Sequence, residues 1–204
     1  FSNYNRDGIK FDLSATKAID SPLISRLWRE HGREVIEDSM DRVWSAWGTA
    51  THAVFEEANK ANSEVLMEKR FLSEYSGKIL SGQVDVYEVN TGILSDIKTC
   101  AAFKVMKGDN TQWENQLNFC AQLMRDNGYK INKLQIVAII KDWSAYKASN
   151  ERNYPEHPVA VIDIPLWTEE TAKEYIEGRV EIHYGDGEKN CSDAERWIRP
   201  GRWA

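Results

Sequence analysis

The chain has 204 residues, 42% of them hydrophobic and eight of them tryptophan, which is enough to bury the core of one folded domain. No run of eighteen apolar residues is present, which excludes a membrane-spanning helix of the usual kind. The net charge of -6 disfavours a protein that coats nucleic acid nonspecifically, although carboxylates that bind a metal also count as negative.

The N-terminal part of the chain is predicted to be helical. Ser14 is placed to cap a first helical turn, and Ser21 followed by Pro22 is typical of the start of a second helix. A third helix is expected from about Ala46 to Ala61. Strands follow, and glycines separate them. Their expected ranges are Val65–Tyr75, Lys78–Val89 and Ile93–Thr99.

The rest of the chain alternates between helix and strand. Asp109 and Asn110 are placed to cap a helix, and Thr168 with two glutamates after it predicts the start of the last one. We expect these helices at about 110–126 and 168–180, with strands between them at Lys133–Ile140 and Val159–Leu166. This order predicts an α/β fold with a mixed sheet.

Two aspartates are predicted to face each other across the second hairpin. With the loop centred between Asn90 and Thr91, Asp85 on one strand lies directly opposite Asp96 on the other. Like charges in this position repel, and a divalent cation between them removes the repulsion. Mg²⁺ and Mn²⁺ are the ions that such oxygen ligands favour.

Lys98 shares a face of this hairpin with the aspartates, because it lies two residues after Asp96. The opposite face is expected to be apolar and to face the core. It carries Val84, Val86, Ile93 and Ile97. The alternative, a solvated hairpin with exposed charges, stays open at this point.

The chain also carries a series of motifs in a fixed order. A helix with Gly-x-x-x-His precedes Gly-x-x-Asp, then Asp-x-Lys, then a helix with Gln. The matching residues are Gly48, His52, Gly82, Asp85, Asp96, Lys98 and Gln116. In this order the chain resembles the PD-(D/E)XK nucleases, in particular the branch with the RecB nuclease domain and lambda exonuclease. That family has Gln-x-x-x-Tyr in the last helix, whereas Cys120 replaces the tyrosine here.

The resemblance implies a restriction-endonuclease-like core, in which helices flank a mixed central β-sheet. It further implies a single domain over residues 1–204. Within it we expect a helical part at about 14–63, a catalytic core at about 64–183 and a tail at 184–204.

The resemblance also implies a role for each site residue. Mg²⁺ or Mn²⁺ would be bound by Asp85, Asp96, the imidazole of His52 and the backbone carbonyl of Ile97. Lys98 would position the attacking water or help to deprotonate it, and would offset the charge that builds on the phosphate. Because imidazole suits Mn²⁺ better than Mg²⁺, we expect activity with Mn²⁺.

Further residues near this set are also assigned roles. Gln116 is expected beside the active site, and Lys104, in a loop after the third strand, is within reach of a phosphate backbone. Gly48 would leave room for a close approach of the helix, and Glu56, one turn after His52, would orient the imidazole. An ordinary solvated role for Lys104 or Glu56 stays open.

The predicted function is that of a metal-dependent DNA nuclease, an exonuclease that acts on DNA ends in recombination, repair or phage DNA processing. A noncatalytic nucleic-acid-binding module of the same fold and a nuclease acting on RNA are the alternatives. Besides DNA, a homo-oligomer or a recombination or replication protein stays open as partner, and no membrane partner is expected. Cys100, Cys120 and Cys191 form no Cys-x-x-Cys pair, so we expect no zinc site or disulfide framework but buried, reduced thiols in a cytoplasmic protein. The iron–sulfur members of the branch that the chain resembles have cysteines on both sides of the nuclease core, whereas Cys191 alone lies beyond it here and no cysteine precedes the His52 helix, so no iron–sulfur cluster is expected.

Overall fold

The structure is a computed structural model and describes residues 8–32, 34 and 39–185. The predicted tail, Cys191 included, lies outside these ranges apart from Tyr184 and Gly185. The division of the chain into a helical part, a core and a tail stays a prediction. Among the described residues, no helix has the length and apolar character needed to cross a membrane.

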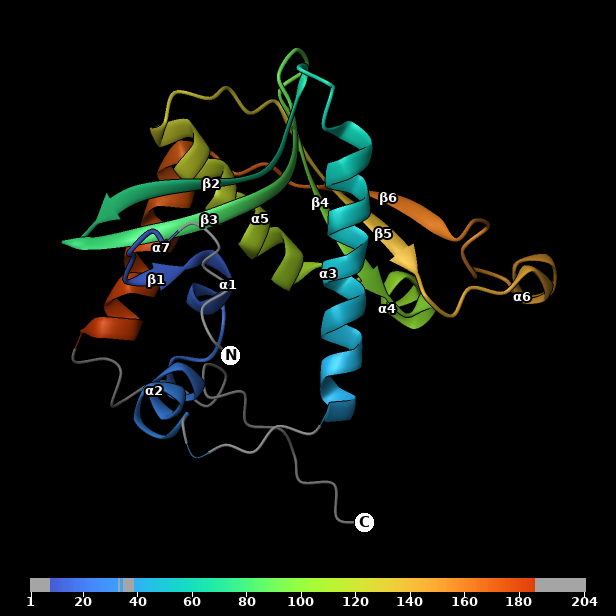
Figure 1. The fold of residues 1–204 in the computed structure, drawn as a ribbon, viewed down its shortest axis with the longest axis horizontal. Coiled ribbons are helices and arrows are strands. Elements are labelled where there is room, and N and C mark those ends of the chain that lie inside the picture. The colour runs from blue at the N-terminus through green and yellow to red at the C-terminus, as the bar shows by residue number, and fades with distance from the viewer. Residues whose placement is uncertain (1–7, 33, 35–38, 186–204) are drawn as a thin grey trace.

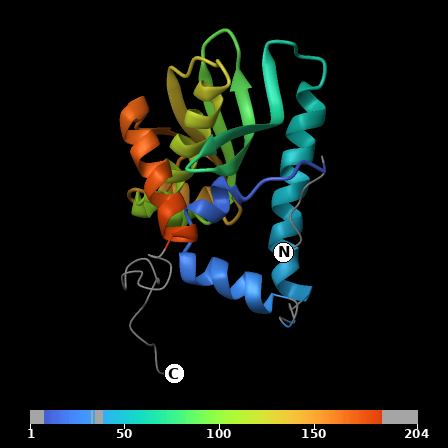
Figure 2. The ribbon, with the colours of Figure 1, turned by 90° about the vertical axis from the view of Figure 1, so that its left-hand side faces the viewer.

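A six-stranded mixed sheet forms the centre of the molecule, with strand order β1-β3-β4-β5-β6 and β2 paired to β3 (Figure 1). Helices α5 and α7 lie on one side of it, and the long helix α3 stands on the other side against β2 and β4 (Figures 1 and 2). This architecture is compatible with a restriction-endonuclease-like core, so the predicted fold class is confirmed. The elements are β1 (Leu13–Ser14), α1 (Ala15–Ala18), α2 (Pro22–His31), α3 (Ser39–Asn59), β2 (Val65–Tyr75), β3 (Lys78–Glu88), β4 (Ile93–Cys100), α4 (Ala102–Lys107), α5 (Thr111–Asp126), β5 (Lys133–Ile140), α6 (Ala145–Asn150), β6 (Val159–Ile164) and α7 (Glu169–Tyr184).

Most predicted elements agree with the structure to within a few residues. Strands β2 and β5 have the predicted bounds. The Ser14 hydroxyl caps α1 by accepting a hydrogen bond of 3.3 Å from the amide of Lys17. Helix α3 begins at Ser39, well before the predicted Ala46. The elements β1, α4 and α6 were not predicted, because pieces this short show no clear hydrophobic period.

The predicted register of the second hairpin is confirmed. Strands β3 and β4 pair antiparallel at Val86 with Ser95, and this register continues to the turn. Asp85 and Asp96 come next in the same register, just beyond the last paired residues. From there β3 stays with β1 and β2, while β4 runs parallel to β5. The two aspartates therefore lie where the hairpin opens into a fork.

The assignment of the hairpin faces is wrong in part. Leu94 shares a face of β4 with Asp96, yet it is fully buried in the main core together with residues of α5. On the face expected to form the core, Val86 and Ile93 are only half-buried. Asp85 and Asp96 are each 7% exposed, so both carboxylates are withdrawn from water.

Gly82 allows α5 to pack directly on β3. A Cβ at this position would lie 3.1 Å from both Cys120 Sγ and Leu123 Cδ1, which is closer than ordinary van der Waals contact. The glycine of the Gly-x-x-Asp motif thus favours this close packing, which brings the helix that carries Gln116 close to the strand that carries Asp85. Cys120 is a buried free thiol, as predicted, whereas the free thiol of Cys100 is only half-buried.

A buried histidine joins α7 to the N-terminal segment. His183 is fully buried, and its Nε2 lies 3.1 Å from the carbonyl oxygen of Ala18. Its Nδ1 has no hydrogen-bond partner within the described part of the chain. Arg179 donates hydrogen bonds to the same carbonyl and to that of Asp20. Burial first, and then the charge of Arg179, lower the pKa of His183 to about 4.

We expect His183 to make the fold acid-sensitive. In the unfolded chain the imidazole takes up a proton near pH 6.5, whereas in the folded protein it stays neutral down to about pH 4. Its contribution is therefore complete above the unfolded pKa, and about 3 kcal/mol of unfolding free energy is lost as the pH falls through this window. Urea unfolding at several pH values measures the loss. His183→Gln should reduce the loss of unfolding free energy between pH 6.5 and pH 4 by about 3 kcal/mol. A variant with the same pH dependence as wild type would refute this role of His183.

Candidate metal centre

Side chains from several elements converge where β3 and β4 diverge. Helix α3 supplies His52, β2 supplies Glu68, β3 supplies Asp85, and β4 supplies Asp96 and Lys98. The strands β2, β3 and β4 follow one another in the chain and pair antiparallel, which sets their side chains side by side. The structure thus brings together the residues that the motif order singled out, with one addition, Glu68.

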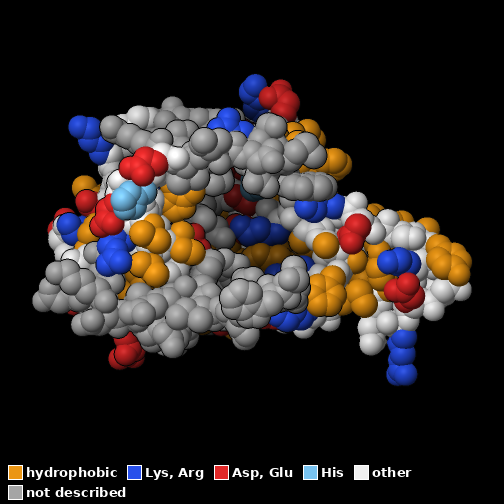
Figure 3. Space-filling model, turned by 90° about the horizontal axis from the view of Figure 1, so that it is seen from below, with side chains coloured by type: hydrophobic (Ala, Val, Ile, Leu, Met, Phe, Trp, Pro, Cys, Tyr) orange, Lys and Arg blue, Asp and Glu red, His pale blue; other side chains and the backbone are white. Residues whose placement is uncertain are grey.

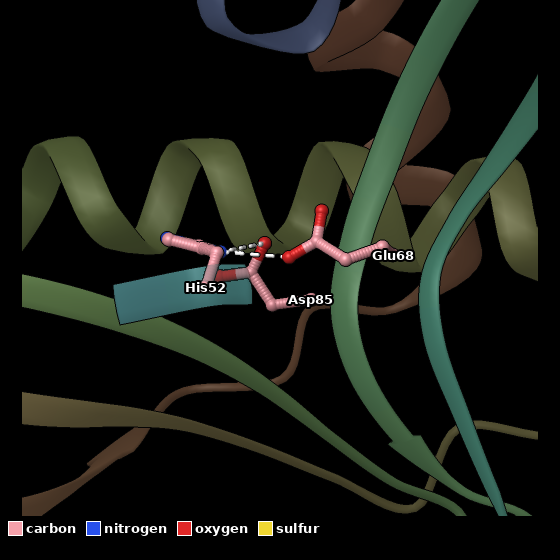
Figure 4. A group of neighbouring side chains, drawn as sticks. All are labelled: His52, Glu68 and Asp85. Carbon is pink, nitrogen blue, oxygen red and sulfur yellow. Dashed lines mark hydrogen bonds and ion pairs between the residues drawn. The ribbon is translucent and has the colours of Figure 1, made fainter. Parts of the chain in front are cut away.

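His52 points between two carboxylates (Figure 4). Its Nδ1 lies 2.8 Å from Glu68 Oε1 and 3.5 Å from Asp85 Oδ1. One ligand atom from each of these three residues lies within 4.8 Å of the others. A set of one imidazole nitrogen and carboxylate oxygens at this spacing suits a divalent metal ion.

Glu68, not Glu56, is the partner of His52. Glu56 is exposed on α3, whereas Glu68 is half-buried beside the imidazole. The turn at Ser76 and Gly77 is the feature of the sequence from which the position of Glu68 could have been predicted. Both have positive φ, 49° and 71°, as expected of a two-residue hairpin turn.

Counting back from that turn places Glu68 directly opposite Asp85. The ladder between β2 and β3 pairs Met67 with Val86 and Lys69 with Val84, but the pair between them is missing. Glu68 has φ 49°, in the left-handed region that a glutamate adopts only at an energetic cost. This backbone irregularity was not predictable from the residue pattern.

The pKa of Asp85 is strongly perturbed. It is 7% exposed, and its Oδ2 accepts a 2.7 Å hydrogen bond from the amide of Ile97. Burial, and after it the negative charge of Asp96, raise the pKa of Asp85 to about 7, although His52, the Ile97 amide and Lys98 oppose the shift. A cation at this point would remove the conflict, so the residues present fit a divalent metal.

Lys98 lies between an acid and an amide. Its Nζ is 2.9 Å from Asp96 Oδ2, as an ion pair, and donates a 3.1 Å hydrogen bond to Gln116 Oε1. Asp96 Oδ2 is buried and accepts no well-aligned hydrogen bond from the residues that the structure describes. Burial alone would lower the pKa of Lys98, but the charges of Asp96 and Asp85 outweigh it, so that the pKa is raised. Lys98 is therefore a fixed cation.

The same electrostatics apply to His52. The hydrogen bond to Glu68 raises the pKa of His52, burial lowers it, and the charge of Asp85 raises it again, with a net upward shift. In the metal-free protein the imidazole therefore holds its proton more tightly than usual. Metal binding requires the neutral ring, so we expect a proton to be released when a cation binds.

The structure bears on two predictions about flanking residues. A Cβ at Gly48 would lie 4.0 Å from Thr99 Oγ1, so no protein atom among the described residues needs the room that this glycine leaves. Lys104 lies in helix α4 and not in a loop. Its ammonium is 4.7 Å from the centre of the Trp113 ring and donates a hydrogen bond to the carbonyl of Asp109, which joins α4 to the start of α5.

A polar hollow adjoins the charged cluster. Its volume is about 190 Å³, and it is lined by the N-terminal segment, β2, β3 and α5, including Thr16, Arg70, Gln83 and Gln116. Because Gln116 also contacts Lys98, the hollow and the cluster share a wall. Seen from below, Lys or Arg side chains and acidic side chains lie within a depression near the middle of the molecule (Figure 3).

Comparison with known proteins shows the fold. No protein-family model matches the chain, and no curated protein sequence matches it. The crystal structure of SSO0001 is similar, with a TM-score of 0.59 and 20% identity over 86% of this chain and 79% of that one. The crystal structure of a phage-related exonuclease from Haemophilus somnus 129PT is also similar, with a TM-score of 0.51 and 9% identity over 87% of this chain and 83% of that one. At these identities the likeness shows that the chain shares the fold of these two proteins and no more.

Proposed function

We propose that the protein is a divalent-metal-dependent deoxyribonuclease, an exonuclease that acts on DNA ends. One observation carries the proposal. Asp85 and Asp96, buried at the open end of a hairpin, share their site with a charged lysine, Lys98. The fold shared with a phage-related exonuclease supports the same reaction class. Roles in recombination, repair or phage DNA processing are part of the proposal.

We assign the metal ion to the cluster at the fork. His52, Glu68 and Asp85 are close enough to share one ion, and Asp96 with the Ile97 carbonyl would complete the set. Mn²⁺ fits this nitrogen-containing set better than Mg²⁺. When bound, the ion would polarise the phosphoryl oxygens and make water a better nucleophile.

We assign Lys98 to the transition state. Its raised pKa keeps the ammonium charged, so it suits the stabilisation of negative charge on the phosphoryl group better than the removal of a proton from water. Gln116 accepts one of its hydrogen bonds and fixes its direction. Of the roles that the resemblance implies for Lys98, this proposal keeps the offset of phosphate charge and leaves out the deprotonation of water.

We place the incoming DNA strand near helix α4, which begins directly after strand β4. Phe103 on this helix is 71% exposed, and its neighbour Lys104 is held by Trp113 and Asp109. An exposed aromatic ring beside lysines suits base stacking with backbone contact. Lys104 and Gln116 remain the proposed substrate contacts.

A single assay tests the proposal. Labelled linear single-stranded DNA, linear double-stranded DNA, circular DNA and RNA are each incubated with Mn²⁺, Mg²⁺ or chelator. We expect cleavage of linear DNA, at least as fast with Mn²⁺ as with Mg²⁺, and none with chelator. Cleavage of circles would exclude a strictly end-dependent enzyme. Metal binding without cleavage of any substrate would favour a noncatalytic binding module, and cleavage of RNA alone would favour a ribonuclease.

A further inference from the structure

We propose that Gln83 and Arg70 are positioning residues that hold Glu68 against His52 and thereby set the affinity of the metal centre. The inference rests on the proposed metal site, but not on the identity of the substrate. It comes from a chain of contacts on β2 and β3 that leads from the polar hollow to the imidazole.

The strand pairing places these residues in a row. Arg70 and Gln83 are direct cross-strand partners of β2 and β3, and Glu68 and Asp85 are the next residues on the same face. Ser81, two residues before Gln83, continues the row on the other side. The strand pairing brings Arg70, Gln83 and Ser81 together, and the irregular backbone at Glu68 brings its carboxylate to the end of the row.

The hydrogen bonds along the row have a defined direction. Arg70 donates from Nη1 to Ser81 Oγ at 2.7 Å and from Nη2 to Gln83 Oε1 at 2.9 Å. Gln83 Nε2 then donates to Glu68 Oε2 at 2.5 Å. Because a guanidinium can only donate, Arg70 turns the amide oxygen of Gln83 towards itself and the amide NH₂ towards Glu68.

Two of the contacts of Glu68 use different oxygens of its carboxylate. Oε2 is bonded to Gln83, which leaves Oε1 at 2.8 Å from His52 Nδ1. Two features favour movement of the Glu68 side chain away from the cluster. Its backbone has an unfavourable φ of 49°, and its carboxylate lies opposite that of Asp85. The donor on Gln83 offsets these costs.

Gln83 itself is exposed, so its replacement should leave the fold intact. Without the amide donor, Glu68 is expected to leave the imidazole, and the cluster loses one carboxylate ligand. Changes in groups that orient metal ligands typically weaken metal binding by about 10- to 100-fold. The effect should appear in metal affinity even when no DNA is present.

The test is a double-mutant cycle read by calorimetric titration with Mn²⁺. Gln83→Met keeps the length of the side chain but removes both polar groups, and we expect it to weaken Mn²⁺ binding about tenfold. In a Glu68→Gln background, Gln83→Met should alter the Mn²⁺ affinity by less than about twofold, because the carboxylate that Gln83 positions is already absent. Arg70→Lys, which removes the planar guanidinium that bonds both Ser81 and Gln83, should weaken binding in the same coupled way. Gln112→Met, at an exposed position in the first turn of α5, is the matched control.

Each result decides between specific alternatives. Wild-type affinity in Gln83→Met overturns the proposal, and so does an equal loss in both backgrounds, which would indicate a general structural effect. If the wild-type protein binds Mn²⁺ but cleaves no substrate, only the proposed nuclease activity is overturned, and the double-mutant cycle still tests the positioning role of Gln83. A wild-type protein that binds no Mn²⁺ overturns both proposals.

Discussion

Lys98→Ala is expected to slow the cleavage of linear DNA by about a hundred- to a thousandfold while Mn²⁺ affinity stays within a few-fold of wild type. The ammonium is held at 2.9 Å from Asp96 and 3.1 Å from Gln116, and its raised pKa keeps it charged. It is therefore a preorganised positive group that acts on the phosphoryl charge and not on the metal. Single-turnover cleavage with saturating Mn²⁺, together with calorimetric titration of Mn²⁺, separates these effects.

The matched control for this variant is Lys133→Ala. Lys133 also forms a 2.8 Å ion pair with an aspartate, Asp163, but on the surface of the sheet. Its loss should leave both cleavage and metal affinity unchanged. Near-normal turnover in Lys98→Ala would exclude the proposed role of the lysine, and a large loss of Mn²⁺ affinity would place Lys98 in the metal centre.

Asp85→Asn is expected to abolish Mn²⁺ binding and cleavage and, at neutral pH, to raise the melting temperature of the metal-free protein. Asp85 lies between Glu68, Asp96 and His52, and its pKa is raised to about 7 by burial and by the charge of Asp96. An ionised Asp85 therefore destabilises the metal-free fold, most strongly above that pKa. A neutral amide of the same shape removes this cost and can still accept the hydrogen bond from the Ile97 amide.

Thermal unfolding with and without Mn²⁺ measures both effects. Wild type should be stabilised by Mn²⁺, because a ligand that binds only the folded state shifts the equilibrium towards it. Asp85→Asn should start from a higher melting temperature and gain nothing from the ion. Asp163→Asn, at an exposed carboxylate, should behave as wild type. A fall in the melting temperature of metal-free Asp85→Asn would show that the native site tolerates the charge.

Much of the hairpin was predictable because local rules determine it. A tight turn sets the register of its strands, and alternation then fixes which side chains share a face. The position of Asp85 opposite Asp96 followed from these rules, and the structure has this register. The roles of the site residues stay predictions. These roles are catalysis for Asp85, Asp96 and Lys98, metal binding for His52 and Ile97, and substrate binding for Gln116.

The remaining features depend on tertiary contacts that no local rule determines. Glu68 meets His52 only because its backbone adopts a left-handed conformation and α3 packs beside β2. Lys104 is drawn into α4 by Trp113 and Asp109, partners that lie in or before the next helix. Leu94 is buried beside charged residues because α5 covers that face of the sheet, and the hydrophobic pattern of β4 does not reveal which face a later helix will cover.

The consecutive order of β2, β3 and β4 also bears on how the protein folds. The acids and the lysine of the cluster all come from one continuous stretch, Glu68 to Lys98, whose strands are joined by tight turns. Short connections of this kind cost little loop-closure entropy, so this meander can form before distant parts of the chain meet. The repulsion between the carboxylates of the meander must then be overcome early in folding, before helices α3 and α5 bring His52 and Gln116 to the cluster. A cation that binds the meander should therefore speed folding as well as stabilise the folded state.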